Sequence, residues 1–123
     1  MDVIYALVLL YALLVKHAVA DLWIQSSRKP GDKCDFKDPK GYLHAMDHAI
    51  GTFLVVWGLT FDIRDAIVVA LVDFVLHYWI DFFKSLTVKK FKLTTEHTKF
   101  WALQACDQIL HYATYLGITV ALI

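Results

Sequence analysis

The chain has 123 residues and no formal net charge at neutral pH, with 59% hydrophobic residues and a mean hydropathy of +0.52. Soluble domains contain roughly 45–50% apolar residues, so this composition argues against water as the main solvent of the folded chain. The length leaves room for a single domain, the charge balance gives no attraction to nucleic acid, and the two cysteines are too few for a disulfide framework.

The first apolar stretch covers residues 3–25 and predicts a helix. It also resembles a secretory signal, because the small-residue sequence Ala18-Val19-Ala20 follows the apolar run. However, Asp2 stands where a signal would carry a basic residue, and Lys16-His17 interrupts the approach to the cleavage site. We therefore expect this stretch to be the first helix of the mature protein.

The second and third apolar stretches cover residues 41–61 and 63–83. The polar link 26–40 ends in Asp38-Pro39, an N-cap aspartate followed by proline at the first helical position, so the second helix should begin there. Residues 60–62 form a short turn, in which Asp62 can cap the third helix and Asp65 suits its first turn. Such a short link makes these two helices antiparallel neighbours.

The last apolar stretch covers residues 100–123 and follows a basic link in which Thr94 or Thr95 could provide the N-cap. Each of the four stretches has about the 20 residues that a membrane-spanning helix needs. The sequence therefore predicts an all-α protein, a single antiparallel four-helix transmembrane bundle over residues 1–123, with the lipid bilayer as its partner.

The basic residues predict an orientation in that membrane. Ten of the twelve lie in or beside the two long links: Arg28, Lys29, Lys33, Lys37, Lys40, Lys84, Lys89, Lys90, Lys92 and Lys99. Lysine and arginine concentrate on the cytoplasmic side of membrane proteins. Both long links are therefore expected in the cytoplasm, and both termini on the non-cytoplasmic side of a bacterial inner membrane.

Each predicted helix carries one pair of ionisable residues four positions apart, which places the pair on one helix face. The pairs are His17 with Asp21, His44 with His48, His77 with Asp81, and Asp107 with His111. At a rise of about 1.5 Å per residue, all four pairs fall at one level near the lysine-rich side. Because such groups cost at least about 2.5–3.5 kcal/mol in a bilayer, they should face the bundle interior.

Imidazole and carboxylate groups together suit zinc, iron or manganese, and facing pairs of this kind build carboxylate-bridged dimetal sites in helix bundles. Three aspartates and a hydroxide would nearly neutralise two divalent ions. The predicted metal ligands are His17, Asp21, His44, His48, His77, Asp81, Asp107 and His111. The alternative is a polar network that hydrogen-bonds across helices and serves packing alone.

Several neighbouring polar residues could support the site, and most of them also have another interpretation. Gln25 and Gln108 could orient ligands, although Gln25 could equally end a helix. Asp47 and Asp73 could be extra ligands, partners of other polar groups, or the general base that the eight residues do not supply. The lysines nearest the site, at positions 16, 29 and 84, could bind an anionic head group, but we favour snorkelling to the interface.

These motifs resemble an uncharacterised family of small membrane proteins from bacteria and their phages, known only as a domain of unknown function. The resemblance covers nearly the whole chain and rests on His17 and Asp21 followed by Gln25, on His44, on His77 and Asp81 followed by Lys84, and on Asp107-Gln108 with His111. It implies a multi-helix membrane protein and no particular reaction. The His-x-x-x-Asp pairs are also similar to those of membrane-bound metal-dependent hydrolases.

The leading functional hypothesis is a metal-dependent hydrolase acting at the cytoplasmic face on an amphiphilic or phosphate-bearing substrate. One alternative is a non-haem di-iron lipid oxygenase or desaturase, although such enzymes have richer histidine clusters. Another is a non-enzymatic protein, either a proton or metal conduit or a bundle whose polar network fixes helix register. The mostly apolar half near the termini argues against a conduit.

Overall fold

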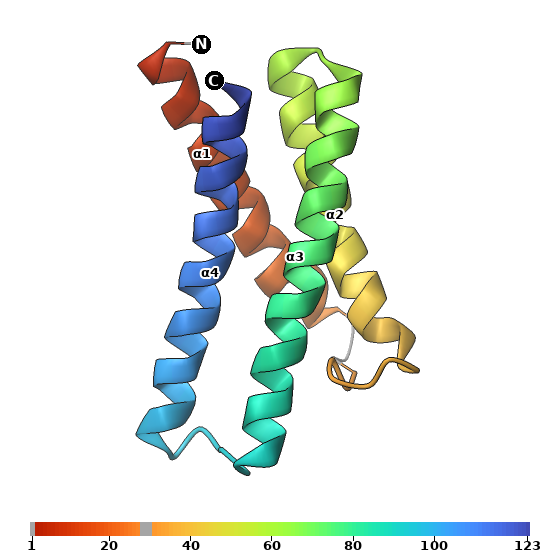
Figure 1. Ribbon diagram of the computed structural model, residues 1–123, viewed down its shortest axis with the longest axis vertical. Helices are drawn as coiled ribbons and strands as arrows, with labels where there is room; N and C mark the ends of the chain where they lie inside the picture. Colours follow the sequence, from red (N-terminus) through yellow and green to blue (C-terminus); the bar gives the residue numbers. More distant parts are fainter. Residues whose placement is uncertain (1, 28–30) are drawn as a thin grey trace.

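The computed structural model describes residues 2–27 and 31–123, and over these residues the protein is all-α, as predicted. Helix α1 (Val3–Ala18) continues into a π-helical turn, η1 (Val19–Ile24), and is followed by α2 (Pro39–Thr60), α3 (Ile63–Lys90) and α4 (Thr98–Leu122). Figure 1 shows the helices running alternately up and down, with both termini at one end and the two long links at the other.

Side-chain caps fix the starts of α2 and α3 where the sequence predicts them. Asp38 accepts a hydrogen bond from the Lys40 amide at 2.9 Å, with Pro39 in the first turn of α2. Asp62 accepts from the Asp65 amide at 3.0 Å. Each cap satisfies a backbone donor that the helix itself leaves unpaired.

The ends around the second long link differ from the prediction. Helix α3 continues to Lys90 rather than ending near residue 83, and its last turn contains Lys89 and Lys90, which suit the negative end of the helix dipole. Neither Thr94 nor Thr95 caps α4, whose N-cap residue is His97. The imidazole Nδ1 of His97 instead accepts a hydrogen bond from the Thr94 amide at 2.9 Å, which shapes the turn before the helix.

Two apolar clusters hold the bundle together. The larger one joins the four helices in the half near the termini and consists of Leu9, Leu13, Val56, Ala66, Val69, Tyr115 and Ile118. The smaller one, Ala45 with Tyr78 and Phe82, packs α2 against α3 nearer the long links. Buried polar side chains occupy the interior beside the larger cluster and between it and the long links.

The outer faces of all four helices are also apolar. Leucines more than half exposed occur on each helix: Leu7, Leu54, Leu71 and Leu116. Within residues 2–27 and 31–123, two helical segments, Val3–Ile24 and Ile63–Lys90, are long and apolar enough to cross a membrane, whereas the sequence predicts four. The other two helices carry polar residues such as Asp47 and Gln108 beside their histidines, which lowers their mean hydropathy.

Candidate metal centre

The structure brings the eight predicted ligand residues together at one level of the bundle. All are buried except Asp21, which is partly exposed. The imidazole ring of His77 lies at the middle of the group, with its centroid 3.7 Å from that of His48 and 4.1 Å from that of His111. The helical spacing of the pairs thus places their side chains in a common interior volume.

Two subsets of these residues have ligand atoms close enough to hold a metal ion. One subset is Asp21, His44, His48 and His77, and the other is His77, Asp81 and His111. Within each subset the ligand atoms all lie within 4.8 Å of one another, and His77 belongs to both. His17 and Asp107 lie beside these subsets, and their role as ligands stays a prediction.

The Asp21 carboxylate lies between two imidazoles of α2. Its Oδ1 atom is 2.8 Å from Nε2 of His48 and 3.1 Å from Nε2 of His44. A metal with ligand bonds of about 2.1 Å would separate neighbouring ligand atoms by about 3.0 Å in octahedral geometry and about 3.4 Å in tetrahedral geometry. The observed separations are close to this range.

The Asp81 carboxylate likewise lies among imidazoles, which come from α2, α3 and α4. Its Oδ1 atom is 3.1 Å from Nε2 of His111, and its Oδ2 atom is 3.3 Å from Nε2 of His77 and 3.5 Å from Nε2 of His44. Asp81 therefore contacts histidines from three helices. Its Oδ1 atom faces His111, whereas its Oδ2 atom faces His44 and His77 and also accepts a hydrogen bond from Lys33 at 2.9 Å.

Hydrogen bonding among the described residues leaves several buried atoms at this site without a partner. They are Nε2 of His44, both ring nitrogens of His77, and Oδ1 of Asp107. His44 Nε2 is near carboxylate oxygens of both Asp21 and Asp81, yet it forms a hydrogen bond with neither. Buried polar groups are rarely left unpaired. Two other imidazoles are hydrogen-bonded to the carboxylates, His48 to Asp21 at 2.8 Å and His111 to Asp81 at 3.1 Å. The unpaired nitrogens of His44 and His77 lie close to these carboxylates and suit a cation placed between them.

Hydrogen bonds on the α1–α4 side link the carboxylates through Gln108, as expected for a residue that orients ligands. His17 Nδ1 lies 2.8 Å from the Tyr115 hydroxyl, and His17 Nε2 lies 3.1 Å from Gln108 Oε1. Gln108 Nε2 donates to Asp107 at 3.1 Å and to Asp21 at 3.5 Å. Both nitrogens of His17 thus have hydrogen-bond partners, in contrast to those of His77.

Lys16 does not snorkel to the interface, contrary to the sequence interpretation. It is buried, and its ammonium donates to Asp73 at 2.8 Å, to the His48 carbonyl at 3.1 Å and to the Tyr115 hydroxyl at 3.1 Å. Thr52 also donates to Asp73, at 2.5 Å. Asp73 is therefore the ionic partner of Lys16, one layer closer to the termini than the histidines.

The close packing of Lys16 predicts a difference between two glycines of α2. A Cβ atom at Gly51 would lie 3.1 Å from Cδ of Lys16, whereas one at Gly58 would meet nothing within 4 Å. Alanine is favoured over glycine in a helix by about 1 kcal/mol. We expect Gly58→Ala to raise the free energy of unfolding by up to that amount, and Gly51→Ala to give a smaller gain or a loss. Unfolding curves in detergent measure this difference. Equal gains in the free energy of unfolding for the two variants would contradict the close contact between Gly51 and Lys16.

Two lysines border the site on the side of the long links. Lys33, in the first link, donates to Asp81 at 2.9 Å and to Gln25 at 3.5 Å. Lys84, in α3, donates to Gln104 at 3.1 Å and lies 3.5 Å from Asp107. Lys84 therefore points to the site rather than snorkelling, and Lys29 lies outside the described residues.

The fold of the first link explains why Lys33 reaches inward. Asp32 accepts hydrogen bonds from the thiol and the amide of Cys34 and from Lys89, and these lower its pKa to about 2. The Asp32 amide donates to Asp38 at 2.7 Å. Sequence reasoning missed Lys33 as a site residue, because no helical periodicity places it. The sequence signal for its position was the pair Asp32 and Asp38, because aspartates of this kind close local turns.

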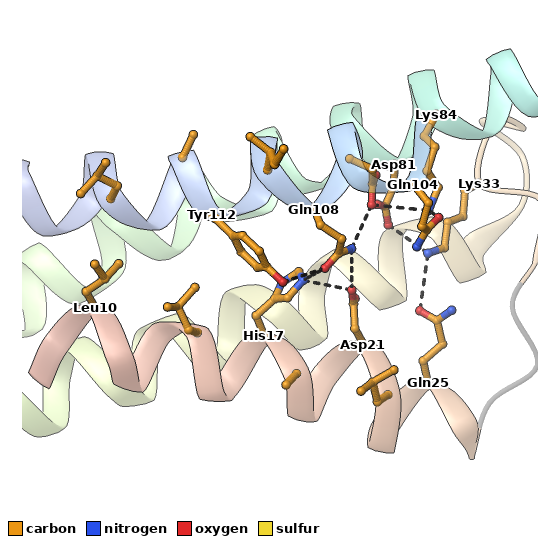
Figure 2. A pocket seen from close by; sticks show the side chains of 17 residues that line it. Leu10, His17, Asp21, Gln25, Lys33, Asp81, Lys84, Gln104, Gln108 and Tyr112 are labelled. Carbon is orange, nitrogen blue, oxygen red and sulfur yellow. Dashed lines mark hydrogen bonds and ion pairs between the residues drawn. The ribbon is translucent and has the colours of Figure 1, made fainter. Parts of the chain in front are cut away.

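A cavity of about 830 Å³ opens onto the cluster between α1 and α4. Figure 2 shows Lys33, Lys84, Gln25 and Gln104 at one end of this cavity, His17 and Tyr112 in the middle, and Leu10 toward the other end. Asp21, Asp81 and Asp107 line its wall. Asp47 and Asp73, the candidate general bases, are not among its lining residues.

The match to a family model covers residues 9–123, which include all four ionisable pairs. The protein belongs to this family, described as protein of unknown function (DUF3307). No curated protein and no solved structure matches the chain.

Proposed function

We propose that this protein is a membrane-embedded, metal-dependent hydrolase that acts on an amphiphilic, phosphate-bearing substrate at the cytoplasmic face. The observation that carries the proposal is the pair of buried ligand subsets that share His77, whose two ring nitrogens form no hydrogen bond among the described residues. A cation would satisfy the ring nitrogens of His77 and Nε2 of His44, which are buried without a hydrogen-bond partner among the described residues.

The exposed surface supports a membrane location. Large apolar side chains are exposed on every helix, including Leu71 at 62% and Leu116 at 53%. Soluble monomers rarely expose contiguous apolar patches of this extent. The long links carry most of the lysines, so the positive-inside rule places them, and the neighbouring metal centre, on the cytoplasmic side.

The arrangement of ligands supports two metal positions. Asp21 with His44 and His48 would hold one ion, and Asp81 with His111 would hold the other. His77 lies between them and could complete either set. Zinc or manganese suits the mixture of imidazole and carboxylate ligands, and iron would suit it equally.

Hydrolysis would need a metal-activated water and access for the substrate, and the cavity provides that access. A bound divalent metal lowers the pKa of a coordinated water toward neutrality and polarises the bond under attack. The partly exposed Asp21 carboxylate lines the cavity, so a substrate can reach the centre from the α1–α4 side. Gln108 holds Asp21 and Asp107 from the same side and would keep their oxygens in place during turnover.

The proposal predicts stoichiometric metal in the purified protein. Mass spectrometry of the detergent-solubilised chain should find about two transition-metal ions per chain, with both His77→Ala and Asp107→Ala reducing this content. His97→Ala is the matched control, because His97 is exposed in the second long link and its imidazole hydrogen-bonds to Thr94, far from the cluster.

The identity of the metal separates hydrolysis from oxidation. Zinc or manganese, together with chelator-sensitive release of nitrophenol from a nitrophenyl phosphate ester, would support the hydrolase. Iron with an oxygen-sensitive absorption band would favour a di-iron oxidoreductase instead. Substoichiometric metal that is unaffected by His77→Ala would contradict both and leave a structural polar network.

A further inference from the structure

We propose that the α1–α4 cavity binds a phosphate monoester of a single hydrocarbon chain, with the phosphate at Lys33 and Lys84 and the chain along the apolar wall. The inference rests on the proposed function and names its substrate class. It depends on the charges around the cluster and on the way polar and apolar residues divide the cavity.

The charge balance at the cluster calls for an anionic ligand. Asp21, Asp81 and Asp107 bring three negative charges, and the ammonium groups of Lys33 and Lys84 offset two of them. Two divalent ions would then leave an excess of three positive charges around neutral imidazoles. A metal-bound hydroxide and a phosphate monoester dianion would together neutralise this excess, and a neutral ester would not.

The ammonium groups of the two lysines have N–H donors that could bind such a phosphate. An ammonium group has three N–H donors. Lys33 uses its donors on Asp81 and, at 3.5 Å, on Gln25, while Lys84 donates to Gln104 and lies 3.5 Å from Asp107. Both lysines line the cavity, and Figure 2 shows them at the same polar end of it.

Beyond His17 and Tyr112, the cavity wall that leads away from the lysines is apolar. The apolar lining residues are Leu10, Leu14, Ala18, Leu22, Ile109, Ala113 and Leu116. From Gln108 to Leu116 the wall extends about 12 Å along α4, given a rise of about 1.5 Å per residue. Ile109, Ala113 and Leu116 are exposed, so this part of the cavity would open sideways to the hydrocarbon of a bilayer. A hydrocarbon chain could enter from there without leaving the membrane.

The volume fits one small amphiphile. Small-molecule sites usually enclose about 300–1,000 Å³, are mostly apolar and fix the ligand through a few polar groups. This cavity has about 830 Å³ and one polar end. Burial of each methylene in such a wall is favourable. The chain should therefore add to the affinity that the phosphate obtains from the lysines and metals.

Calorimetric titration of the full chain in a neutral maltoside detergent tests this assignment, with hexyl phosphate and inorganic phosphate as probes. The wild-type protein should bind hexyl phosphate at least 10-fold more tightly than inorganic phosphate. Ala113→Trp should fill the apolar wall and remove this advantage, while inorganic phosphate still binds. Ala105→Trp is the matched control on an exposed position of α4 outside the cavity, and it should keep the advantage.

The lysines are tested by Lys33→Gln combined with Lys84→Gln, which should weaken both probes at least 10-fold. Lys37→Gln with Lys40→Gln changes two exposed lysines outside the cavity, one in the first link and one at the start of α2, and should weaken neither probe. Equal affinity for the two probes, or equal behaviour of Ala113→Trp and Ala105→Trp, would overturn the inference.

Metal content measured on the same samples separates the two proposals. A protein that holds its metal ions but shows no preference for hexyl phosphate overturns this inference and leaves the hydrolase standing. A protein that prefers hexyl phosphate but contains no metal, before or after incubation with zinc or manganese, supports the cavity assignment and overturns the hydrolase.

Discussion

Asp81→Asn is expected to lower the affinity of the protein for its metal ions by at least about 100-fold. Removal of groups that merely orient metal ligands already costs 10–100-fold in affinity. Asp81 does more, because its two oxygens lie within 3.5 Å of Nε2 atoms from three histidines. Asparagine keeps the shape of the side chain but removes the negative charge and one acceptor oxygen. Competition with a metal-binding dye in detergent measures the change.

Asp65→Asn is the control for this substitution. Asp65 lies on the same helix, in the exposed first turn, far along α3 from the histidines. Its replacement should leave the metal affinity unchanged. If the two variants bound metal as tightly as the wild-type chain, Asp81 would be a packing residue and the two-subset interpretation of the cluster would be wrong.

Lys16→Met is expected to destabilise the folded protein by about 3–5 kcal/mol, the range measured when one partner of a buried ion pair is removed. The Lys16 ammonium holds Asp73 at 2.8 Å, and both side chains are less than 10% exposed. Methionine fills similar volume but leaves the Asp73 carboxylate with Thr52 as its remaining hydrogen-bond donor in the described part of the chain. Unfolding curves in detergent, followed by circular dichroism, give the loss.

The companion variant removes both charges. Lys16→Met combined with Asp73→Leu replaces the pair by apolar groups, and such replacements are often neutral or stabilising. The double variant should therefore be more stable than Lys16→Met alone. If instead the two losses simply added, the Lys16–Asp73 contact would not carry the free energy assigned to it.

Much of the candidate site could be predicted from helical periodicity. A residue and its fourth neighbour share a helix face, and a bundle with alternating helix directions brings matching depths together. These two facts were enough to place His44, His48, His77 and His111 in one interior volume. The same reasoning located the start of α2 at Asp38, because capping depends on local sequence.

The features that sequence reasoning missed depend on contacts between distant segments. Lys16 was expected at the interface, since a lysine near a helix end usually snorkels. Its burial requires Asp73 from α3 and Tyr115 from α4, which no local pattern connects to it. Lys33 reaches the cluster because the first link folds back over it, and the turns that do this were not anticipated.

The π-helical turn η1 is a further feature that the sequence did not indicate. It begins directly after α1 and contains Asp21. Single turns of this kind are rare and often occur at functional sites. Here the turn still leaves Asp21 Oδ2 3.1 Å from His17 Nε2, while Asp21 Oδ1 contacts the histidines of α2. The irregular turn thus carries a carboxylate that has imidazole neighbours from both α1 and α2.

X-ray absorption spectroscopy of the metal-loaded protein tests the central claim most directly, because it reports the atoms bound to the metal. Imidazole nitrogen and carboxylate oxygen ligands at about 2.0–2.2 Å are predicted, with the imidazole contribution reduced in His77→Ala. A first coordination sphere of water or detergent oxygens without imidazole, in a protein that retains its helical fold, would contradict the assignment of a metal centre to these helices.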